Sequence, residues 1–513
     1  MNLMLILPVL APALAALAAV LLGWRRSVAW AGVAASAVVL AVGVAAGAAT
    51  VDGDVLELVG TLRADALTAV MLIVIGAVSV IATWVGVGYV ERELANGATT
   101  PRGARRYQLL VQLFVATMAG AVLASNLGVL WAAVEATTIV TAFLVGHHGG
   151  RRAVEATWKY VIICSVGIAL AYLGTVLVYY ASQHTGGVGS AAGDGAGSLD
   201  WAVLAAHAGE LDPGVMRIAV VLLVLGFGTK VGLVPMHSWL PDAHSQAPAP
   251  VSALMSGVLL SVAAYALLRH RVIAAAVDPG FLRALLLVVG LGSVAVAASL
   301  MIAQRDYKRL LAYSSIEHMG LVMVGVAVGT RLAIAAALLH VIGHGLAKAV
   351  LFCGSGEVLD EYGTTRIDGV RGLLARRPEL GGVFGVGVVA LLGLPPFSIF
   401  ASELALARAA AADGLAWVVA VALVLLLVVF VAMARPVAAM LFGRPGTAVP
   451  ALDGGHPADG GRTFDGAARS DGVARPGVAV APLVVGLVAL AVIGVLTPLD
   501  GLLEAAATIV GTR

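Results

Sequence analysis

The sequence predicts an all-α, polytopic membrane protein of about fourteen transmembrane helices, with two inverted five-helix repeats and two broken helices. Hydrophobic residues make up 60% of the 513 positions and charged residues only 12%, which is about half the charged share of an ordinary soluble domain. The mean hydropathy is +1.00, too high for a chain that hides its apolar residues only in its own core. Lipid must therefore cover much of its surface.

The apolar residues form runs that are long enough to cross a bilayer, which takes about 20 helical residues. These runs lack the alternation of membrane strands, so no strands are expected. The expected spans are 3–22, 28–48, 65–90, 108–124, 126–146, 155–181, 215–240, 249–270, 283–303, 309–328, 333–356, 380–407, 415–442 and 478–510.

The distribution of cations predicts the orientation. Arg25 and Arg26 follow the first run and no cation precedes it, so we expect an uncleaved first helix with its N-terminus outside. Of the 31 Lys and Arg residues, 19 lie in loops on the predicted cytoplasmic side and 8 on the other side. Because cytoplasmic loops carry excess Lys and Arg, both termini are expected outside the cell membrane of a prokaryote. The Gly-rich loops 182–214 and 443–477 are expected to be flexible connectors.

Several function classes are disfavoured by the composition. The net charge of +2 gives no case for a nucleic-acid partner. The chain has two cysteines, Cys164 and Cys353, whereas an iron–sulfur cluster usually needs four thiolates and a structural zinc site four ligands. We therefore expect no cofactor on this chain. It has no Gly-rich nucleotide loop and no nucleophile–base array, so it is expected to be at most a non-catalytic subunit of an oxidoreductase complex.

Charged residues inside the spans point to transport. Only four residues are lysines, and Lys159, Lys230 and Lys348 fall within apolar spans. A buried lysine can give up its proton, whereas arginine stays charged. Each intramembrane charge costs roughly 2.5–3.5 kcal/mol on an insertion scale, so such groups must face the bundle interior. The alternative is a set of buried salt bridges that only specify packing. The acids of the expected group are Glu135, Glu317 and Glu403.

Two histidines extend this group into a stripe. His340, His344 and Lys348 are spaced four apart, which places them on one face of a helix. Histidine titrates near neutrality, so the stripe favours a proton relay. Packing histidines remain an alternative. A zinc site from His340 and His344 is a weaker one, because no third ligand lies at matching local spacing.

Prolines predict two broken helices. Pro235 cannot donate to the carbonyl of Val231, and Pro395 and Pro396 free the carbonyls of Leu391 and Leu392. Freed backbone groups inside a membrane must face protein or water, and a broken helix in each half is typical of inverted-repeat transporters. Plain kinks are the alternative. The expected organisation is helices 1–3 in 1–107, repeats in 108–270 and 283–442, a cytoplasmic loop 443–477 and a fourteenth helix in 478–513.

Several segments of the sequence resemble a known family. The segment GFGTKVGLVPMHSWLPDAHSQAPAPVSALMSGVLL, together with the histidine–lysine stripe, is similar to the antiporter-like subunits of complex I, Mrp-type cation/proton antiporters and membrane-bound nickel–iron hydrogenases. The resemblance covers about residues 65–442. The segments LWAAVEATTIVTAFLVG, RLLAYSSIEHMGLV and GLAKAVLFCGSGEVL are most similar to the F subunit of hydrogenase-4. The chain lacks the long lateral helix of the distal complex I subunit, so a compact module is expected.

The resemblance implies roles for individual residues. Glu135 and Lys230 would be the glutamate of the fifth helix and the lysine of the broken seventh, with Lys159 between them. His344 and Lys348 would form the central relay, and Glu403 the exit group. The remaining candidates are Asp242 and His244 near the cytoplasmic entrance, and the pair Glu317–His318 that is typical of the hydrogenase-4 branch.

The predicted function is proton translocation within an energy-converting redox complex. Its expected partners are other membrane subunits and a peripheral iron–sulfur module, with or without a nickel–iron subunit. The alternatives are an Mrp-type sodium/proton antiporter subunit, a complex I middle-type subunit, and a non-conducting membrane anchor for a hydrogenase.

Overall fold

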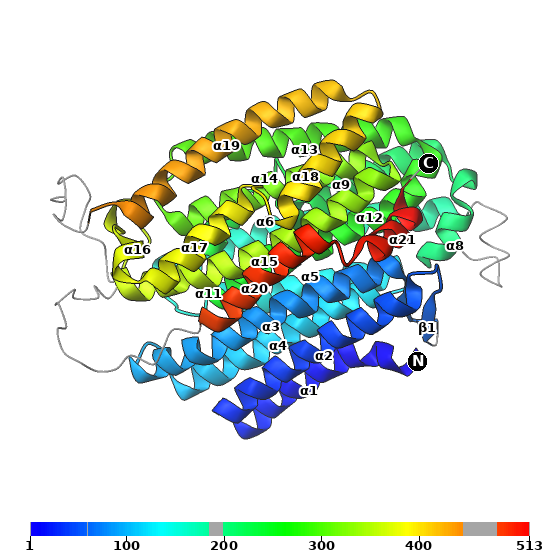
Figure 1. Ribbon diagram of the computed structural model, residues 1–513. Coiled ribbons are helices and arrows are strands. Elements are labelled where there is room, and N and C mark those ends of the chain that lie inside the picture. The colour runs from blue at the N-terminus through cyan, green and yellow to red at the C-terminus, as the bar shows by residue number, and fades with distance from the viewer. Residues whose placement is uncertain (1, 59, 184–197, 445–479, 512–513) are drawn as a thin grey trace.

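The computed structural model shows a bundle of long helices lying side by side, with α1 and α2 at one edge and α19 at the other (Figure 1). It describes residues 2–58, 60–183, 198–444 and 480–511. Within these ranges twelve helices are long and apolar enough to cross a membrane, and counting a bent pair makes thirteen. The prediction of an all-α, polytopic membrane protein is confirmed.

The N-terminal half of the chain contains the helices on both sides of the first break. Their bounds are η1 (Asn2–Ile6), α1 (Leu7–Leu22), α2 (Arg26–Thr50), α3 (Ala66–Ala95), α4 (Pro101–Leu123), α5 (Leu127–Val145), α6 (Arg151–Gln183), α8 (Trp201–Ala206), η2 (Ala208–Glu210), α9 (Pro213–Val231), α10 (Trp239–Gln246), α11 (Ala249–Leu254), the π-helical η3 (Met255–Leu259) and α12 (Leu260–Val277).

The C-terminal half adds a second set of helices around a long central one. Their bounds are α13 (Pro279–Ile302), α14 (Tyr307–Val328), α15 (Arg331–Tyr362), η4 (Ile367–Gly369), α16 (Leu373–Arg376), α17 (Pro378–Leu391), α18 (Ser398–Ala412), α19 (Ala416–Phe442), α20 (Val480–Leu496) and α21 (Asp500–Val510). The pair α20 and α21 is bent by 78°. At the end opposite α16 lie α8, α21 and the N-terminal segment (Figure 1).

Both predicted helix breaks are present. The expected span 215–240 ends at Val231, where Gly232 takes a left-handed conformation with φ 84° before Pro235. The expected span 380–407 divides into α17 and α18, of 14 and 15 residues, and Gly393 with φ 63° precedes Pro395. Glycine tolerates positive φ without steric cost, so a glycine just before the proline helps to end each helix. Neither α17 nor α18 is long enough to count as a span alone.

Broken helices leave backbone groups that need new hydrogen-bond partners. At the first break the indole of Trp239 donates to the carbonyl of Thr229 at 2.8 Å, and the backbone N–H of Val234 donates to Ser293 Oγ at 3.0 Å. Side chains therefore replace the helical hydrogen bonds, as an apolar surrounding requires.

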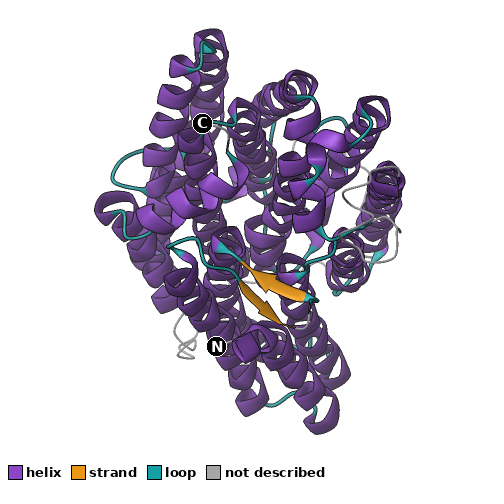
Figure 2. Cartoon of the chain, turned by 90° about the vertical axis from the view of Figure 1, so that its right-hand side faces the viewer, coloured by secondary structure: helices purple, strands orange, loops and turns teal. Residues whose placement is uncertain are grey.

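Two expectations about the connections are wrong in part. A short antiparallel hairpin, β1 (Leu56–Leu58) and β2 (Leu62–Ala64), joins α2 to α3 at one end of the bundle (Figure 2). Such short strands lie outside the membrane-length runs on which the expectation rested. In the expected connector 182–214, the apolar WAVLAA forms α8, which Asp200 caps. The connector 443–477 lies almost wholly outside the described residues.

A buried ion pair links α3 to α12. The guanidinium of Arg269 donates to both carboxylate oxygens of Asp65 at 2.7 Å, and the two side chains are 0% and 4% exposed. Arg269 also donates to Tyr265 and Thr68, at 2.9 Å each, and lies over the ring of Trp201 at 4.1 Å. This pair therefore connects three segments that are far apart in the sequence.

Two of the most buried helices, α14 and α15, carry candidate residues. The spans of α11–α12 and α14 are 100% buried within the bundle and that of α15 is 89% buried, whereas that of α19 is 17% buried. Gly257 of η3 and Gly345 of α15 touch so closely that a Cβ on either would lie 2.9 Å from the carbonyl oxygen of the other. The candidate groups on α14 and α15 are thus enclosed by surrounding helices.

Candidate proton path

One polar group surrounds the candidate Lys230 at the end of α9. Lys230 is 0% exposed, and its Nζ donates to the hydroxyl of Tyr160 on α6 at 3.1 Å. The Tyr160 hydroxyl is also hydrogen-bonded to Thr141 of α5. Trp239, which follows the break, packs on Tyr160 with ring centroids 5.0 Å apart. The break thus places the lysine inside a small polar group between α5, α6 and α9.

Glu135 lies near this group without touching its lysine. It is half-buried on α5, and its carboxylate accepts a hydrogen bond from Thr138 at 3.1 Å. Lys230 forms no ion pair with any carboxylate of the described residues, Glu135 included. Glu135 and Lys230 are therefore not in direct contact in this conformation. The hydroxyl of Tyr160, rather than the carboxylate of Glu135, is the hydrogen-bond partner of Lys230.

Lys159 does not lie between Glu135 and Lys230, contrary to expectation. Its side chain is 48% exposed and pairs with Glu155 at 2.7 Å and Asp242 at 3.1 Å. The neighbouring Tyr160 is the residue that points inward, because successive residues of a helix face different directions. Asp242 of α10 pairs with Arg309 as well, at 2.8 Å. Lys159 and Asp242 thus belong to a surface ion-pair group.

His244 occupies a buried position between the two halves of the candidate path. It is 0% exposed and stacks on Phe352 of α15 at 4.8 Å. Neither ring nitrogen of His244 or of His344 has a hydrogen-bond partner among the described residues. Buried polar nitrogens normally form a hydrogen bond with protein or with water. We therefore expect water molecules to be the hydrogen-bond partners of these two histidines.

A second group surrounds Lys348 on α15. The ammonium of Lys348, which is 0% exposed, donates to the carbonyl of Leu311 at 2.6 Å and to the hydroxyl of Ser314. Ser314 and Glu317 lie on α14, one turn apart. Both line a cavity of about 40 Å³, which can hold a few water molecules.

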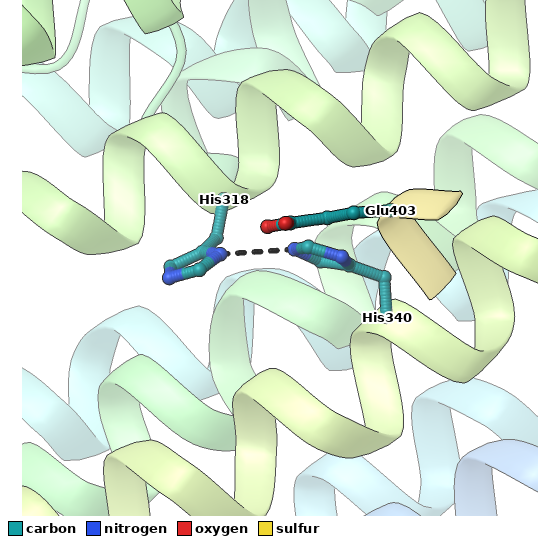
Figure 3. A group of neighbouring side chains, drawn as sticks. All are labelled: His318, His340 and Glu403. Carbon is teal, nitrogen blue, oxygen red and sulfur yellow. Dashed lines mark hydrogen bonds between the residues drawn. The ribbon is translucent and has the colours of Figure 1, made fainter. Parts of the chain in front are cut away.

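Two histidines and a glutamate meet beside this cavity (Figure 3). His318 Nδ1 and His340 Nε2 are 2.9 Å apart, and His340 Nδ1 lies 2.9 Å from the hydroxyl of Ser402. His318 Nε2 lies 3.4 Å from the carboxylate of Glu317. Glu403 of α18 reaches the same place, and one ligand atom from each of His318, His340 and Glu403 lies within 4.8 Å of the others. His344 packs on His318 with ring centroids 5.3 Å apart.

The structure thus gathers six of the expected residues around Lys348 and places Lys230 in a separate polar group with Glu135 nearby. It also adds three residues that the sequence interpretation missed. The added residues are Tyr160, Ser314 and Ser402. Ser314 lies one turn before Glu317, and Ser402 lies directly before Glu403. The two serines could have been predicted from this, because each hydroxyl lies within one helical turn of a carboxylate in an apolar span. Tyr160 has no such sequence signal, and its neighbour Lys159 was predicted to take the inward position instead.

Comparison with known proteins defines the family. The family described as "NADH:quinone oxidoreductase/Mrp antiporter, TM" matches residues 124–431. This chain belongs to that family. The matched region contains both polar groups, from Glu135 to Glu403. The predicted resemblance is confirmed, and the chain is an antiporter-like membrane subunit of the complex I, Mrp and hydrogenase-4 type.

Curated relatives span several branches of the family. The hydrogenase-4 component F homolog of Methylacidiphilum infernorum is 40% identical over 317 residues, which are 61% of this chain and 65% of that protein. The NADH-quinone oxidoreductase subunit N of Desulforudis audaxviator is 35% identical over 310 residues, which are 59% of this chain and 58% of that protein. This chain thus matches less than two thirds of the length of either relative.

Solved structures share the fold over nearly the whole chain. A chain of the archaeal membrane-bound sulfane sulfur reductase superposes with a TM-score of 0.81 at 23% identity, covering 99% of this chain and 98% of that one. A chain of the Mrp complex from Dietzia sp. gives 0.80 at 24% identity, with the same coverage. The fold shared with these two chains therefore extends well beyond residues 124–431.

Proposed function

We propose that this chain is the proton-translocating membrane subunit of an energy-converting redox complex of the hydrogenase-4 type. The observation that carries this proposal is the series of proton-binding groups on α14, α15 and α18, from Lys348 to Glu403. Lys348, Glu317, His318 and His340 are each at most 2% exposed. Charges in a membrane interior are costly and buried ion pairs stabilise poorly, so this concentration favours a role in transport.

The proposed route begins on the cytoplasmic side. Protons enter near Lys230 and His244, pass through His344 and Lys348, and leave near Glu403. Two contacts support the second half of the route. Lys348 donates to Ser314, and Ser314 lines the same cavity as Glu403. His340 extends the series through His318 on one side and Ser402 on the other.

Glu135 supplies a switch in this proposal. An approaching carboxylate favours the charged form of a lysine, so Lys230 holds its proton when Glu135 is near and passes it on when Glu135 withdraws. The arrangement with Lys230 on Tyr160 corresponds to the withdrawn state. Movement of α5 relative to α9 would alternate the two states.

The assignment extends to topology and partners. We propose two inverted repeats, 108–270 and 283–442, whose matching elements are the breaks at Pro235 and at Pro395–Pro396. Both termini would lie outside a prokaryotic cell membrane. The partners would be further membrane subunits and a peripheral iron–sulfur module, and this chain would hold no cofactor.

The first test replaces the central lysine without removing its charge. Lys348→Arg keeps a cation but loses the ability to release a proton, since arginine stays protonated in proteins. We expect at least about a 10-fold loss of proton transport in liposomes that contain the purified complex. Lys159→Arg is the matched control, because Lys159 is half-exposed and arginine can keep its two ion pairs. Undiminished transport by an assembled Lys348→Arg complex would contradict the proposed route.

A second experiment identifies the complex. The tagged chain is purified in mild detergent from its native membrane, and the proteins that accompany it are identified. A hydrogenase-like subunit with iron–sulfur partners supports the redox-driven pump. A set of small membrane proteins alone, with sodium-driven acidification of inverted vesicles in the absence of a redox donor, supports an Mrp-type antiporter instead. A redox complex that pumps equally well with Lys348→Arg supports an anchoring role.

A further inference from the structure

Three side chains from three helices converge in the geometry of a metal site. His318 comes from α14, His340 from α15 and Glu403 from α18, and their ligand atoms lie within 4.8 Å of one another. In a tetrahedral zinc site with ligand distances of about 2.0–2.1 Å, the ligand atoms are about 3.4 Å apart. His318 Nδ1 and His340 Nε2, now 2.9 Å apart, would need to separate by only about half an ångström to admit such an ion. Glu403, whose ligand atom lies within 4.8 Å of the other two, would need to move closer.

An oxygen atom lies beside the outer nitrogen of each histidine. His340 Nδ1 is 2.9 Å from Ser402 Oγ, and His318 Nε2 is 3.4 Å from Glu317 Oε2. Histidines that bind metal nearly always donate their second N–H to an oxygen, which orients the ring and fixes the tautomer. Here each outer nitrogen has an oxygen beside it, and the two inner nitrogens face each other with Glu403 nearby.

The surroundings have the space and the charge that an ion requires. His318, Glu317 and Glu403 line the cavity of about 40 Å³, which leaves room for water as a fourth ligand. The other Glu317 oxygen, Oε1, is buried and has no hydrogen-bond partner among the described residues. Two carboxylates, Glu317 and Glu403, can balance a divalent charge that would otherwise be costly inside a membrane.

We propose that His318, His340 and Glu403 form a binding site for a divalent transition metal ion, with Zn²⁺ as the best fit. Imidazole nitrogens and a carboxylate suit Zn²⁺ and Cu²⁺ rather than Mg²⁺ or Ca²⁺, which prefer oxygen ligands. A bound ion would occupy the nitrogens through which His318 and His340 now contact each other. Zinc should therefore inhibit transport, a consequence that rests on the proposed function.

The test measures metal binding before any transport. The full chain, purified in detergent and stripped with chelator, is loaded with one equivalent of Cu²⁺, and its electron paramagnetic resonance spectrum is recorded. The site predicts superhyperfine coupling to two imidazole nitrogens. Because this measurement uses the unaltered chain, it does not depend on the folding of a variant. A spectrum without nitrogen coupling would overturn the proposal.

Variants then locate the ion by Zn²⁺ titration against a chromophoric chelator. His318→Gln and Glu403→Gln should each weaken binding by at least about 10-fold. His270→Gln is the matched control, since His270 is also a buried helical histidine but packs beside Phe227 on another part of the bundle. Equal loss in the control, or no loss in the two variants, would overturn the site. Inhibition by Zn²⁺ is measured last. Binding without inhibition would refute only the functional consequence, and absence of transport before Zn²⁺ is added would count against the proposed function alone.

Discussion

The ion pair between Asp65 and Arg269 offers a sharp test of the packing of α3 against α12. Asp65→Asn keeps the shape of the side chain but leaves a guanidinium that is 0% exposed without its counter-charge. Removing one partner of a buried pair costs about 3–5 kcal/mol. Arg269 would keep its bonds to Tyr265 and Thr68 and its place over Trp201, so we expect the lower end, about 3 kcal/mol.

The assay is reversible unfolding of the purified chain in mixed micelles with increasing denaturing detergent. The double variant Asp65→Leu/Arg269→Met is the informative partner, because replacing both members of a buried pair with apolar residues is often neutral or stabilising. We expect the double variant to be more stable than Asp65→Asn alone. A loss below about 1 kcal/mol for Asp65→Asn, typical of exposed pairs, would refute the inference that this pair is desolvated in the membrane protein.

Two further predictions concern the candidate path. Gly257→Ala places a methyl group 2.9 Å from the Gly345 carbonyl oxygen, so the free energy of unfolding should fall by about 1–3 kcal/mol; an unchanged unfolding midpoint would show that η3 and α15 are not in close contact. Tyr160→Phe removes the hydroxyl that accepts from Lys230 at 3.1 Å, and hydrogen bonds to charged groups contribute about 1.5–3 kcal/mol. We expect about a 10-fold or greater loss of proton transport by complexes reconstituted in liposomes. Transport at the wild-type rate would show that the Tyr160 hydroxyl is not part of the proton path.

The sequence predicts the broad architecture because membrane burial is a strong constraint. Long apolar runs fix where helices lie, and prolines fix two breaks within a few residues, at Gly232 and Gly393. The burial of Lys230 and Lys348 is predictable for the same reason, since an exposed ammonium in lipid is costly. What the sequence cannot supply is which face of each helix turns inward. Lys159 and Tyr160 are neighbours, and only packing decides that the tyrosine is the one buried.

Convergence between helices is also beyond local spacing. His318 and His340 are separated by 22 positions, and His340 and Ser402 by 62. Along the helix that carries His340 and His344, no third metal ligand lies at a matching local spacing. The structure supplies a carboxylate from α18 instead, because the break before Ser398 brings that helix to the side of α15. The hairpin of β1 and β2 was missed since three-residue strands leave no periodic signal.

The wall between the cavity and the lipid has an electrical consequence. Leu426, Val429, Phe430 and Met433 of α19 close the cavity that Glu317 and Glu403 line, and Phe430 is itself 40% exposed on the outer surface. At this point the insulation between a polar interior and the bilayer is a single helix thick. Its apolar side chains form a low-dielectric layer between the carboxylates of Glu317 and Glu403 and the membrane. A polar residue at Val429 would weaken that layer, because it would place a hydrogen-bonding group between the cavity and the bilayer.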